Sequence, residues 1–398
     1  MRLEEKCARD KRARQLMEAG CYPYFLPIEA STDTEVVVGG RRCIMLGSNN
    51  YLGLTHDPRI VEAAQAAIAQ YGAGVTGSRF LNGNLDLHEQ LEGELADFFG
   101  TESALVFSTG YQANVGVISA LIGRTDRVFL DKLDHASIVD ACRMSQAEII
   151  RFAHNDLNEL RARLDADRNN GHARGDRYVV VDGIFSMEGD VADVAGLVSL
   201  CRDQQAVLVV DEAHAVGVLG PRGAGTAEHF GVVDQVDVLV GTFSKSFASI
   251  GGFAAGSAGV MHFLRHNARS LMFSAGLPPS AVATALKALD IIRTEPERRE
   301  RLWAITRRMA GEYRRLGFET GPSETPIVPI YSGTPERTLE LWAALFEEGV
   351  YTNPILAPAV PAGECRLRTS FIATHSDAQL DRALDVFERV GRRLGFVR

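Results

Sequence analysis

Five short apolar runs, each followed by a polar residue or a glycine turn, constrain the fold of this chain more than any other feature. The runs lie in ALVFSTG (104–110), RVFLDKLDHAS (127–137), RYVVVDGIFSMEGD (177–190), AVLVVDEAHAVG (206–217) and DVLVGTFSK (237–245). Near-continuous Val, Leu and Ile are typical of strands that are buried on both faces, as in parallel sheets. Amphipathic segments separate the runs and predict helices that cover both faces. The sequence therefore predicts an α/β fold with a mostly parallel sheet.

The chain divides into three expected segments. Residues 1–45 form an N-terminal arm with a hairpin in EVVVGGRRCIML, turning at Gly39 and Gly40. Residues 46–275 form the large domain that contains the sheet. Residues 276–398 form a smaller C-terminal α+β domain, where LPPS (277–280) begins a long helical stretch. There the strand-like TPIVPIYS and CRLRTSF alternate with the helical ERTLELWAALFEEG and DAQLDRALDVFERVGRRLG.

Composition narrows the class of protein and its partners. A net charge of −9 argues against a nucleic-acid partner, which needs a basic face. The six cysteines form no CxxC pair and suit no metal site, so we expect no metal and a reducing cytoplasm. The charged start MRLEEKCARDKRAR lacks the apolar region of a secretory signal. We expect no integral membrane segment, since no apolar run approaches about 18 residues; peripheral membrane contact stays open.

Polar side chains follow the predicted strands at points that a parallel sheet brings together. Ligands of open parallel sheets bind at the carboxyl ends of the strands. The candidates are the STGY turn (108–111), His135, Asp182, Asp211, His214 and Lys245. Each one alone has an ordinary structural explanation, such as a helix cap, a hydrogen-bonded histidine or a loop lysine. Their order at successive strand ends predicts one site.

Lys245 indicates the chemistry of that site. It follows a buried strand and has no carboxylate within seven residues on either side. Burial lowers the pKa of such an amine, which can then form a Schiff base with a carbonyl. Pyridoxal phosphate supplies that carbonyl. Asp211 would hold the ring nitrogen, and His214 would donate to the phenolic oxygen.

The sequence also contains candidate residues to bind the phosphate and the ring face of the cofactor. The glycine turn before the predicted helix YQANVGVISALI favours a phosphate at the helix N-terminus. Thr242 and Ser244 flank the lysine and add hydroxyl donors. His135 would stack on the ring face.

Nine segments carry a resemblance to a known family. They are SNNYLGL (48–54), GSRFLNGNLDLHEQLE (77–92), FSTGYQANVG (107–116), DHASIVDA (134–141), DGIFSMEGD (182–190), VDEAHAVGVLGPRGAG (210–225), GTFSKS (241–246), FSAGLPPS (273–280) and RLRTS (366–370). Together they resemble the α-oxoamine synthases, a family of fold-type I pyridoxal-phosphate transferases. The DEAH tetrapeptide belongs to this pattern, because the chain lacks the P-loop that a helicase needs.

The resemblance implies an activity and further roles. Family members condense an amino acid with an acyl-CoA, lose carbon dioxide and release an aminoketone. Lys245 would also remove the Cα proton, and the phosphate would be held by Gly110, Tyr111, Thr242 and Ser244. Ser274 would reach the phosphate of a neighbouring subunit, because these enzymes are homodimers with shared sites. Arg368 would pair with the amino-acid carboxylate, and Asn50 would lie near it, whereas Arg366 is expected to be a surface arginine.

Within the family, GSRFLNGNLDLHEQLE and GTFSKS resemble the serine palmitoyltransferase subgroup. That likeness implies L-serine and palmitoyl-CoA as substrates, a 3-ketosphinganine-type product and a place in sphingolipid biosynthesis. A short, polar N-terminal segment leaves the acyl length, and acyl-CoA versus an acyl carrier protein, open.

Three alternatives remain. The first is a family member of the 8-amino-7-oxononanoate synthase or 2-amino-3-ketobutyrate CoA ligase type, which uses alanine or glycine with a shorter acyl thioester. The second is a plain aminotransferase, which would lack the DGIFSMEGD and LNGNLDLHEQLE matches. The third is an idle partner subunit, which would lack the lysine.

Overall fold

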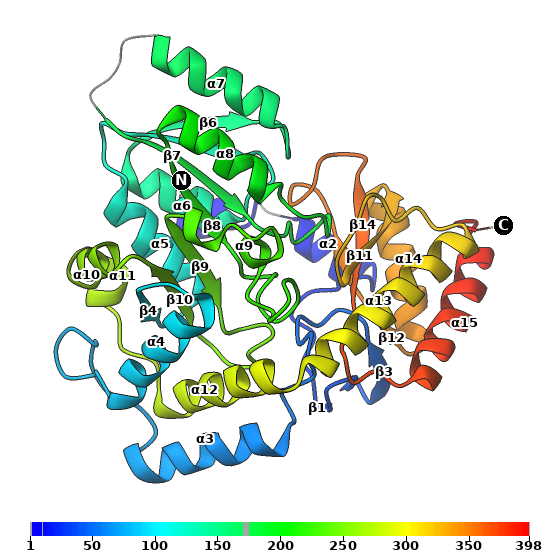
Figure 1. Ribbon diagram of the computed structural model, residues 1–398. Coiled ribbons are helices and arrows are strands. Elements are labelled where there is room, and N and C mark those ends of the chain that lie inside the picture. Colours follow the sequence, from blue (N-terminus) through cyan, green and yellow to red (C-terminus); the bar gives the residue numbers. More distant parts are fainter. Residues whose placement is uncertain (1, 10, 170–174, 398) are drawn as a thin grey trace.

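The computed structural model describes residues 2–9, 11–169 and 175–397. Its centre is a seven-stranded sheet in the order β4–β10–β9–β8–β7–β5–β6 (Figure 1). The strands are β4 (Ser103–Phe107), β5 (Arg127–Asp131), β6 (Glu148–Phe152), β7 (Arg177–Asp182), β8 (Val207–Asp211), β9 (Val238–Thr242) and β10 (Gly252–Gly256). Strands β5 to β9 pair in parallel, whereas β10 lies antiparallel between β4 and β9. The predicted mostly parallel sheet is confirmed.

Both faces of this sheet are covered, because the strands are apolar on both sides. Val179 and Val181 of β7 belong to one core cluster, and Val180 between them belongs to the other. Helices α5 (Gly110–Leu121), α6 (Ala136–Ser145), α10 (Ala258–Asn267) and α11 (Arg269–Met272) pack on the Val180 side. The opposite face is covered by α4 (Asp86–Phe99), α7 (Leu157–Asn169), α8 (Val194–Gln204) and α12 (Pro279–Thr294). The sheet is therefore the middle layer of three.

The long helical stretch predicted from residue 277 consists of two helices. Helix α12 packs beside α3 (Pro58–Tyr71), and α13 (Pro296–Leu316) continues towards the C-terminal segment (Figure 1). Pro296 interrupts the run because it has no backbone N–H to donate. The shorter helices are α1 (Leu3–Cys7), α2 (Arg12–Glu18), α9 (Thr226–His229) and the 3₁₀ turn η1 (Val233–Gln235).

The C-terminal segment contains a second sheet in the order β11–β14–β13. Its strands are β11 (Ile327–Gly333), β13 (Asn353–Ile355) and β14 (Cys365–Ser370), and its helices are α14 (Pro335–Glu347) and α15 (Asp377–Arg393). Because β14 is the central strand, both of its edges are paired. These elements agree with the α+β alternation that the sequence predicts for this segment.

The N-terminal hairpin is present as β2 (Glu35–Val38) and β3 (Arg41–Met45). Gly39 and Gly40 have φ of 57° and 72°, which a two-residue turn of this kind requires. Strand β1 (Ala30–Ser31) pairs with β2, and β12 (Val350–Tyr351) pairs in parallel with β3. The arm thus joins a strand from the C-terminal segment. The division at residues 45 and 275 stays a prediction.

No helix in the described part of the chain is long and apolar enough to cross a membrane. Within the same residues, no cluster of His, Cys, Asp and Glu side chains is suited to hold a metal ion.

Candidate active site

The carboxyl ends of β7, β8 and β9 and the N-termini of α5 and α6 border a cavity of about 350 Å³. Asp182, at the end of β7, also lines it. Eight of the predicted site residues line this cavity: Gly110, Tyr111, His135, Asp211, His214, Thr242, Ser244 and Lys245. Residues that are up to 135 positions apart in the chain therefore line one cavity, Gly110 and Lys245 being the extremes.

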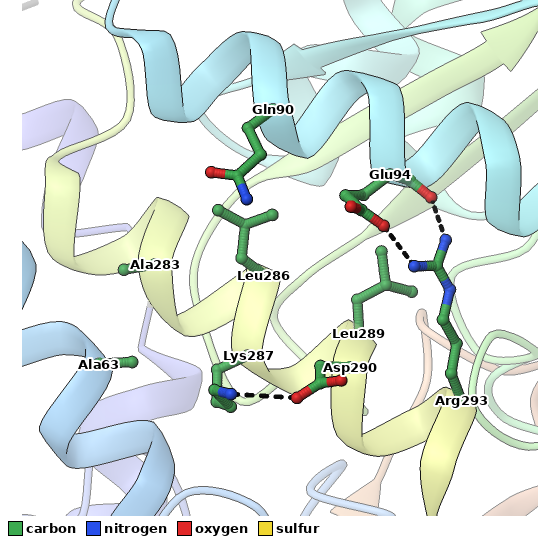
Figure 2. A pocket seen from close by; sticks show the side chains of 9 residues that line it. All are labelled: Ala63, Gln90, Glu94, Ala283, Leu286, Lys287, Leu289, Asp290 and Arg293. Carbon is green, nitrogen blue, oxygen red and sulfur yellow. Dashed lines mark hydrogen bonds and ion pairs between the residues drawn. The ribbon is translucent and has the colours of Figure 1, made fainter.

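A cavity of about 430 Å³ between α3, α4 and α12 offers a comparison (Figure 2). Its charged side chains pair with each other: Lys287 Nζ lies 3.0 Å from Asp290 Oδ2, and Arg293 binds the Glu94 carboxylate. Arg293 also donates to the Glu94 carbonyl at 2.6 Å. The charged side chains that line this cavity are therefore paired with each other.

Lys245 borders that cavity as a partly buried amine. Burial lowers its pKa to about 8, against the opposing effect of Asp211 and Asp182, whose negative charges raise it. Arg368 lowers the pKa further. A much larger fraction of this amine is uncharged near neutral pH than of an ordinary lysine, which suits a nucleophile.

Asp211 ends β8 and is buried. Its Oδ2 accepts from Asn114 Nδ2 at 2.6 Å, and its Oδ1 accepts from the Ala213 amide at 2.9 Å. Asn114 Nδ2 also donates to Ser137 Oγ at 2.9 Å. Two N–H donors therefore hold the carboxylate towards the cavity. Sequence reasoning missed Asn114, although it lies in the FSTGYQAN segment.

His135 caps the N-terminus of α6 beside a second buried carboxylate. Its backbone N–H donates to Asp182 Oδ2 at 2.7 Å, and its Nδ1 lies 2.7 Å from Ser137 Oγ. Burial lowers the pKa of His135, so the ring is neutral. Burial and the charge of Asp211 raise the pKa of Asp182 well above its usual value. The ring of His135 is thereby held in place at the cavity wall.

His214 is buried, and its Nδ1 lies 2.8 Å from the Tyr51 hydroxyl. Burial lowers the pKa of His214 well below its ordinary value, with smaller contributions from Lys245 and Arg368. The Tyr51 oxygen accepts from Arg368 Nη2 at 3.3 Å, and its own proton has two acceptors in reach, His214 Nδ1 at 2.8 Å and Asn49 Oδ1 at 3.4 Å. The shorter contact favours donation to Nδ1 of the neutral ring. Nε2 then carries the ring proton as a donor. Tyr51 belongs to SNNYLGL, but nothing in the sequence ties it to His214.

Arg368 lies on β14 and is only 4% exposed. Its Nε donates to the Ser186 carbonyl at 2.6 Å, and its Nη2 donates to Asn49 Oδ1 at 2.9 Å. Its hydrogen-bond partners in the described residues are all uncharged, and none of those residues forms an ion pair with it. A buried guanidinium of this kind favours an anionic ligand.

The N-terminus of α5 and the end of β9 approach each other closely. Thr242 Oγ1 lies 2.8 Å from Ser244 Oγ and donates to the Gly251 carbonyl at 2.9 Å. A Cβ at Gly110 would come within 2.8 Å of the Thr242 side chain. Only glycine therefore lets the N-terminus of α5 approach these hydroxyls so closely. The helix N-terminus and the hydroxyls form a cradle suited to a phosphate.

These groups fit pyridoxal phosphate part by part. The α5 N-terminus with Thr242 and Ser244 would hold the phosphate, and Asp211 would pair with a protonated ring nitrogen. His214 Nε2 would donate to the phenolic oxygen, and Lys245 is the nearby amine for the aldehyde.

Three predicted residues do not line the cavity: Arg368, described above, Ser274 and Asn50. Ser274 Oγ accepts from Gln112 Nε2 at 3.0 Å, and its contact with a second subunit stays a prediction. Asn50 is buried, but its amide binds Asp33 Oδ1 at 3.0 Å and Thr55 Oγ1 at 2.9 Å. The adjacent Asn49, which sequence reasoning missed, contacts Arg368 instead. The role of Asn50 near the substrate stays a prediction.

The surroundings of Tyr111 and Arg366 differ from those expected from the sequence. Tyr111 lines the cavity, but the residue is 48% exposed and its hydroxyl donates to Asp140 Oδ2 at 2.9 Å. Arg366 was expected at the surface, and this is wrong: it is 0% exposed. Its Nη1 lies 3.0 Å from Glu188 Oε1, and its Nη2 lies 3.2 Å from Glu364 Oε2. The physical reason is that β14 is a central strand whose faces are both covered.

This chain is similar to known proteins over almost its whole length. The family model for class I and II aminotransferases matches residues 41–387. A serine palmitoyltransferase from Sphingobacterium spiritivorum is 47% identical over 389 residues, which cover 98% of this chain and 96% of the relative. An 8-amino-7-oxononanoate synthase from Geotalea daltonii is 42% identical, with 96% of each chain covered.

A solved serine palmitoyltransferase structure with bound pyridoxal phosphate superposes with a TM-score of 0.95 at 38% identity. The match covers 100% of both chains. The chain therefore belongs to the class I and II aminotransferase family of fold-type I pyridoxal-phosphate enzymes, and within it to the α-oxoamine synthases.

Proposed function

We propose that this α-oxoamine synthase condenses L-serine with a long-chain acyl-CoA, palmitoyl-CoA in the first place. The products would be a 3-ketosphinganine-type aminoketone, coenzyme A and carbon dioxide. The observation that carries the proposal is the contrast between two buried arginines on β14. Arg366 has the carboxylates of Glu188 and Glu364, whereas Arg368 has only uncharged partners among the described residues.

An amino-acid carboxylate would give Arg368 the anionic partner that it lacks among the described residues. The three hydrogen bonds of Arg368 within the described chain use Nε and Nη2, which leaves Nη1 for a ligand. Arg368 also lowers the pKa of both Lys245 and His214, so its charge acts on the cavity. A carboxylate held there would place the amino acid with its Cα towards Lys245.

The other residues would divide the remaining work. Pyridoxal phosphate, when bound, supplies an electron sink for the charge that develops at Cα. Asp211 would keep that sink effective by holding a proton at the ring nitrogen. Lys245, as an amine with a pKa of about 8, would take the Cα proton and return one later. His214 would donate from Nε2, with Tyr51 holding the opposite ring nitrogen.

Serine is placed first because relatives named serine palmitoyltransferase are 44–47% identical over almost the whole chain. The second candidate is alanine with a shorter acyl thioester. It is favoured by the relative from Geotalea daltonii, named 8-amino-7-oxononanoate synthase, at 42% identity.

We also propose a homodimer with shared active sites. Phe80, Leu81 and Phe273 are 51%, 78% and 70% exposed. Their segments are adjacent, since the Gly276 amide donates to the Gly77 carbonyl at 2.9 Å. An exposed apolar patch beside Ser274 is suited to a second copy of the chain. The cytoplasmic location and the absence of a nucleic-acid partner stay predictions.

The test is product mass spectrometry. Purified holoenzyme would be incubated with serine, alanine or glycine and a mixture of acyl-CoA thioesters of different lengths. We expect an aminoketone that carries the serine side chain and a long acyl chain, together with one free thiol per product. An alanine-derived product from a short thioester would instead establish the second candidate. Amino-group exchange with a keto acid, without loss of carbon dioxide, would refute both.

A further inference from the structure

The segment between β7 and Val191 is attached to three different elements of the fold. This clamped segment, residues 183–190, closes on itself through the Phe185 amide, which donates to the Asp190 carbonyl at 3.1 Å. A bridge between Ile184 and Val191 flanks the turn. From its middle, the Ser186 carbonyl accepts from Arg368 Nε at 2.6 Å. Together with Asn49 and Tyr51, this carbonyl therefore fixes where the Arg368 guanidinium points.

The first attachment comes from the same strand as Arg368. Arg366 and Arg368 are two residues apart on β14, so their side chains leave the same face. Arg366 Nη1 lies 3.0 Å from Glu188 Oε1 and donates to the Met187 carbonyl at 3.4 Å. Tyr331 fixes Arg366 in turn. Its hydroxyl lies 3.0 Å from Nη1, and its ring packs against the guanidinium.

The second attachment lies at the other end of the clamped segment. Asp190 Oδ2 lies 2.7 Å from His154 Nε2, while His154 Nδ1 lies 3.0 Å from Asp131 Oδ1. The His154 ring also packs edge-on against Phe185, with 4.3 Å between ring centroids. Asp131 ends β5, so this contact ties the segment to the main sheet.

The third attachment involves the chain before β11. The Gly189 carbonyl accepts from Thr325 Oγ1 at 2.8 Å and from the Glu324 amide at 3.0 Å. The segment is therefore tied to the large sheet and to the small sheet at once. Buried ion pairs add little net stability compared with apolar side chains of the same size. Their consequence here is geometric.

We infer that Glu188 and Asp190 are positioning residues for amino-acid binding: they hold the clamped segment so that Ser186 keeps Arg368 directed at the substrate carboxylate. The inference rests on the proposed role of Arg368. Displacing a carboxylate-binding arginine by a fraction of its length weakens the contact with a carboxylate. It leaves the amine of the substrate unaffected.

The test compares two ligands that differ only in that carboxylate, L-serine and ethanolamine. Both would be titrated into holoenzyme carrying Glu188→Gln or Asp190→Asn, following the visible absorbance of the cofactor. Each variant nearly preserves side-chain shape and removes one charge. We expect the Kd for serine to rise about tenfold and the Kd for ethanolamine to change by less than about twofold. Because the two variants act at opposite ends of the segment, either one suffices if the other fails to fold.

Glu348→Gln is the matched control. Glu348 is a partly buried glutamate that pairs with Arg389 and Arg393, away from the clamped segment. We expect it to lower thermal stability without altering either Kd. Unchanged serine binding in the two test variants, or equal weakening of both ligands, would overturn the inference.

The failure of the proposed function has a different signature. If unaltered enzyme binds ethanolamine as tightly as serine, Arg368 does not receive a carboxylate, and the proposed function is refuted together with the inference. If unaltered enzyme prefers serine and the two variants keep that preference, only the inference is refuted.

Discussion

The hydroxyl of Tyr51 lies 2.8 Å from Nδ1 of His214. The same oxygen accepts from Arg368 Nη2 at 3.3 Å, and all three side chains are buried. Tyr51 therefore connects the proposed cofactor donor with the proposed substrate arginine. Its proton also decides which nitrogen of the neutral His214 ring carries hydrogen.

Replacing Tyr51 with Phe removes the hydrogen bonds of its hydroxyl to His214, Arg368 and Asn49 and leaves the ring in place. We expect the Kd for serine to rise about tenfold, because only the lost bond to Arg368 bears directly on the carboxylate and one buried hydrogen bond is worth about that factor. Titration of the holoenzyme by cofactor absorbance measures it. Tyr71→Phe, which removes an exposed hydroxyl that binds Asp86, is the control. Equal serine affinity in the two variants would contradict the role of Tyr51.

Replacing Lys245 with Ala should abolish turnover and covalent attachment of the cofactor. The reason is that Lys245 is the lysine that lines the cavity with Asp211 and His214. Borohydride reduction followed by intact-protein mass spectrometry measures attachment. Lys287→Ala, at a lysine paired with Asp290, should leave attachment unchanged. Cofactor still attached covalently in Lys245→Ala would rule out the assignment.

The pKa of Lys245, lowered to about 8 by burial, predicts how pH controls cofactor uptake by apo-protein. Only the uncharged amine attacks the aldehyde, so the rate of attachment should rise with pH and level off above about 9. Stopped-flow absorbance over a range of pH values gives the midpoint. A rate that is still climbing towards the ordinary value of 10.5 would show that the amine is not desolvated.

Replacing Asp211 with Asn removes the negative charge that would hold the ring nitrogen protonated. The new amide would also face the Asn114 amide, which donates to Asp211 at 2.6 Å. We expect cofactor content to stay near that of the unaltered protein and turnover to fall roughly 100-fold or more. Cofactor content per chain and the rate of thiol release are the two measurements. Near-normal turnover would remove Asp211 from the mechanism.

His154 should make stability depend on pH. Two aspartates raise its pKa to about 10, overcoming the effect of burial, which lowers it. A raised pKa stabilises the fold fully below the unfolded value of 6.5, and this stabilisation declines as pH rises towards 10. The melting temperature of the unaltered protein should exceed that of His154→Gln most at pH 6. A difference that grows with pH would contradict the assigned charge.

Local sequence patterns were enough to predict the large sheet and much of the cavity lining. A strand buried on both faces needs a continuous apolar run, and such a run can be recognised in the sequence without knowing which strands lie beside it. The carboxyl ends of parallel strands meet at one edge, so Asp211 at the end of β8 and Lys245 just after β9 were expected together. Both line the cavity. The hairpin at Gly39 and Gly40 was likewise legible from a two-residue turn.

Contacts between distant segments could not be predicted from the sequence. Arg366 and Arg368 look alike in RLRTS, and their burial depends on β11 and β13, which enclose β14 from both sides. Glu188, the buried carboxylate that pairs with Arg366, is 178 residues away in the chain, so no local pattern separates a structural arginine from a ligand-binding one.

The direction of a loop side chain also depends on contacts between distant segments. Asn49 and Asn50 are adjacent, yet one contacts Arg368 and the other binds Asp33 and Thr55. Backbone geometry imposed by packing decides between them. Periodicity along the chain therefore established the elements and the edge where chemistry occurs, whereas long-range contacts assigned each polar side chain its partner. The physical reason is that strand formation depends on neighbouring residues, while the charge balance of a buried group depends on whatever the fold brings beside it.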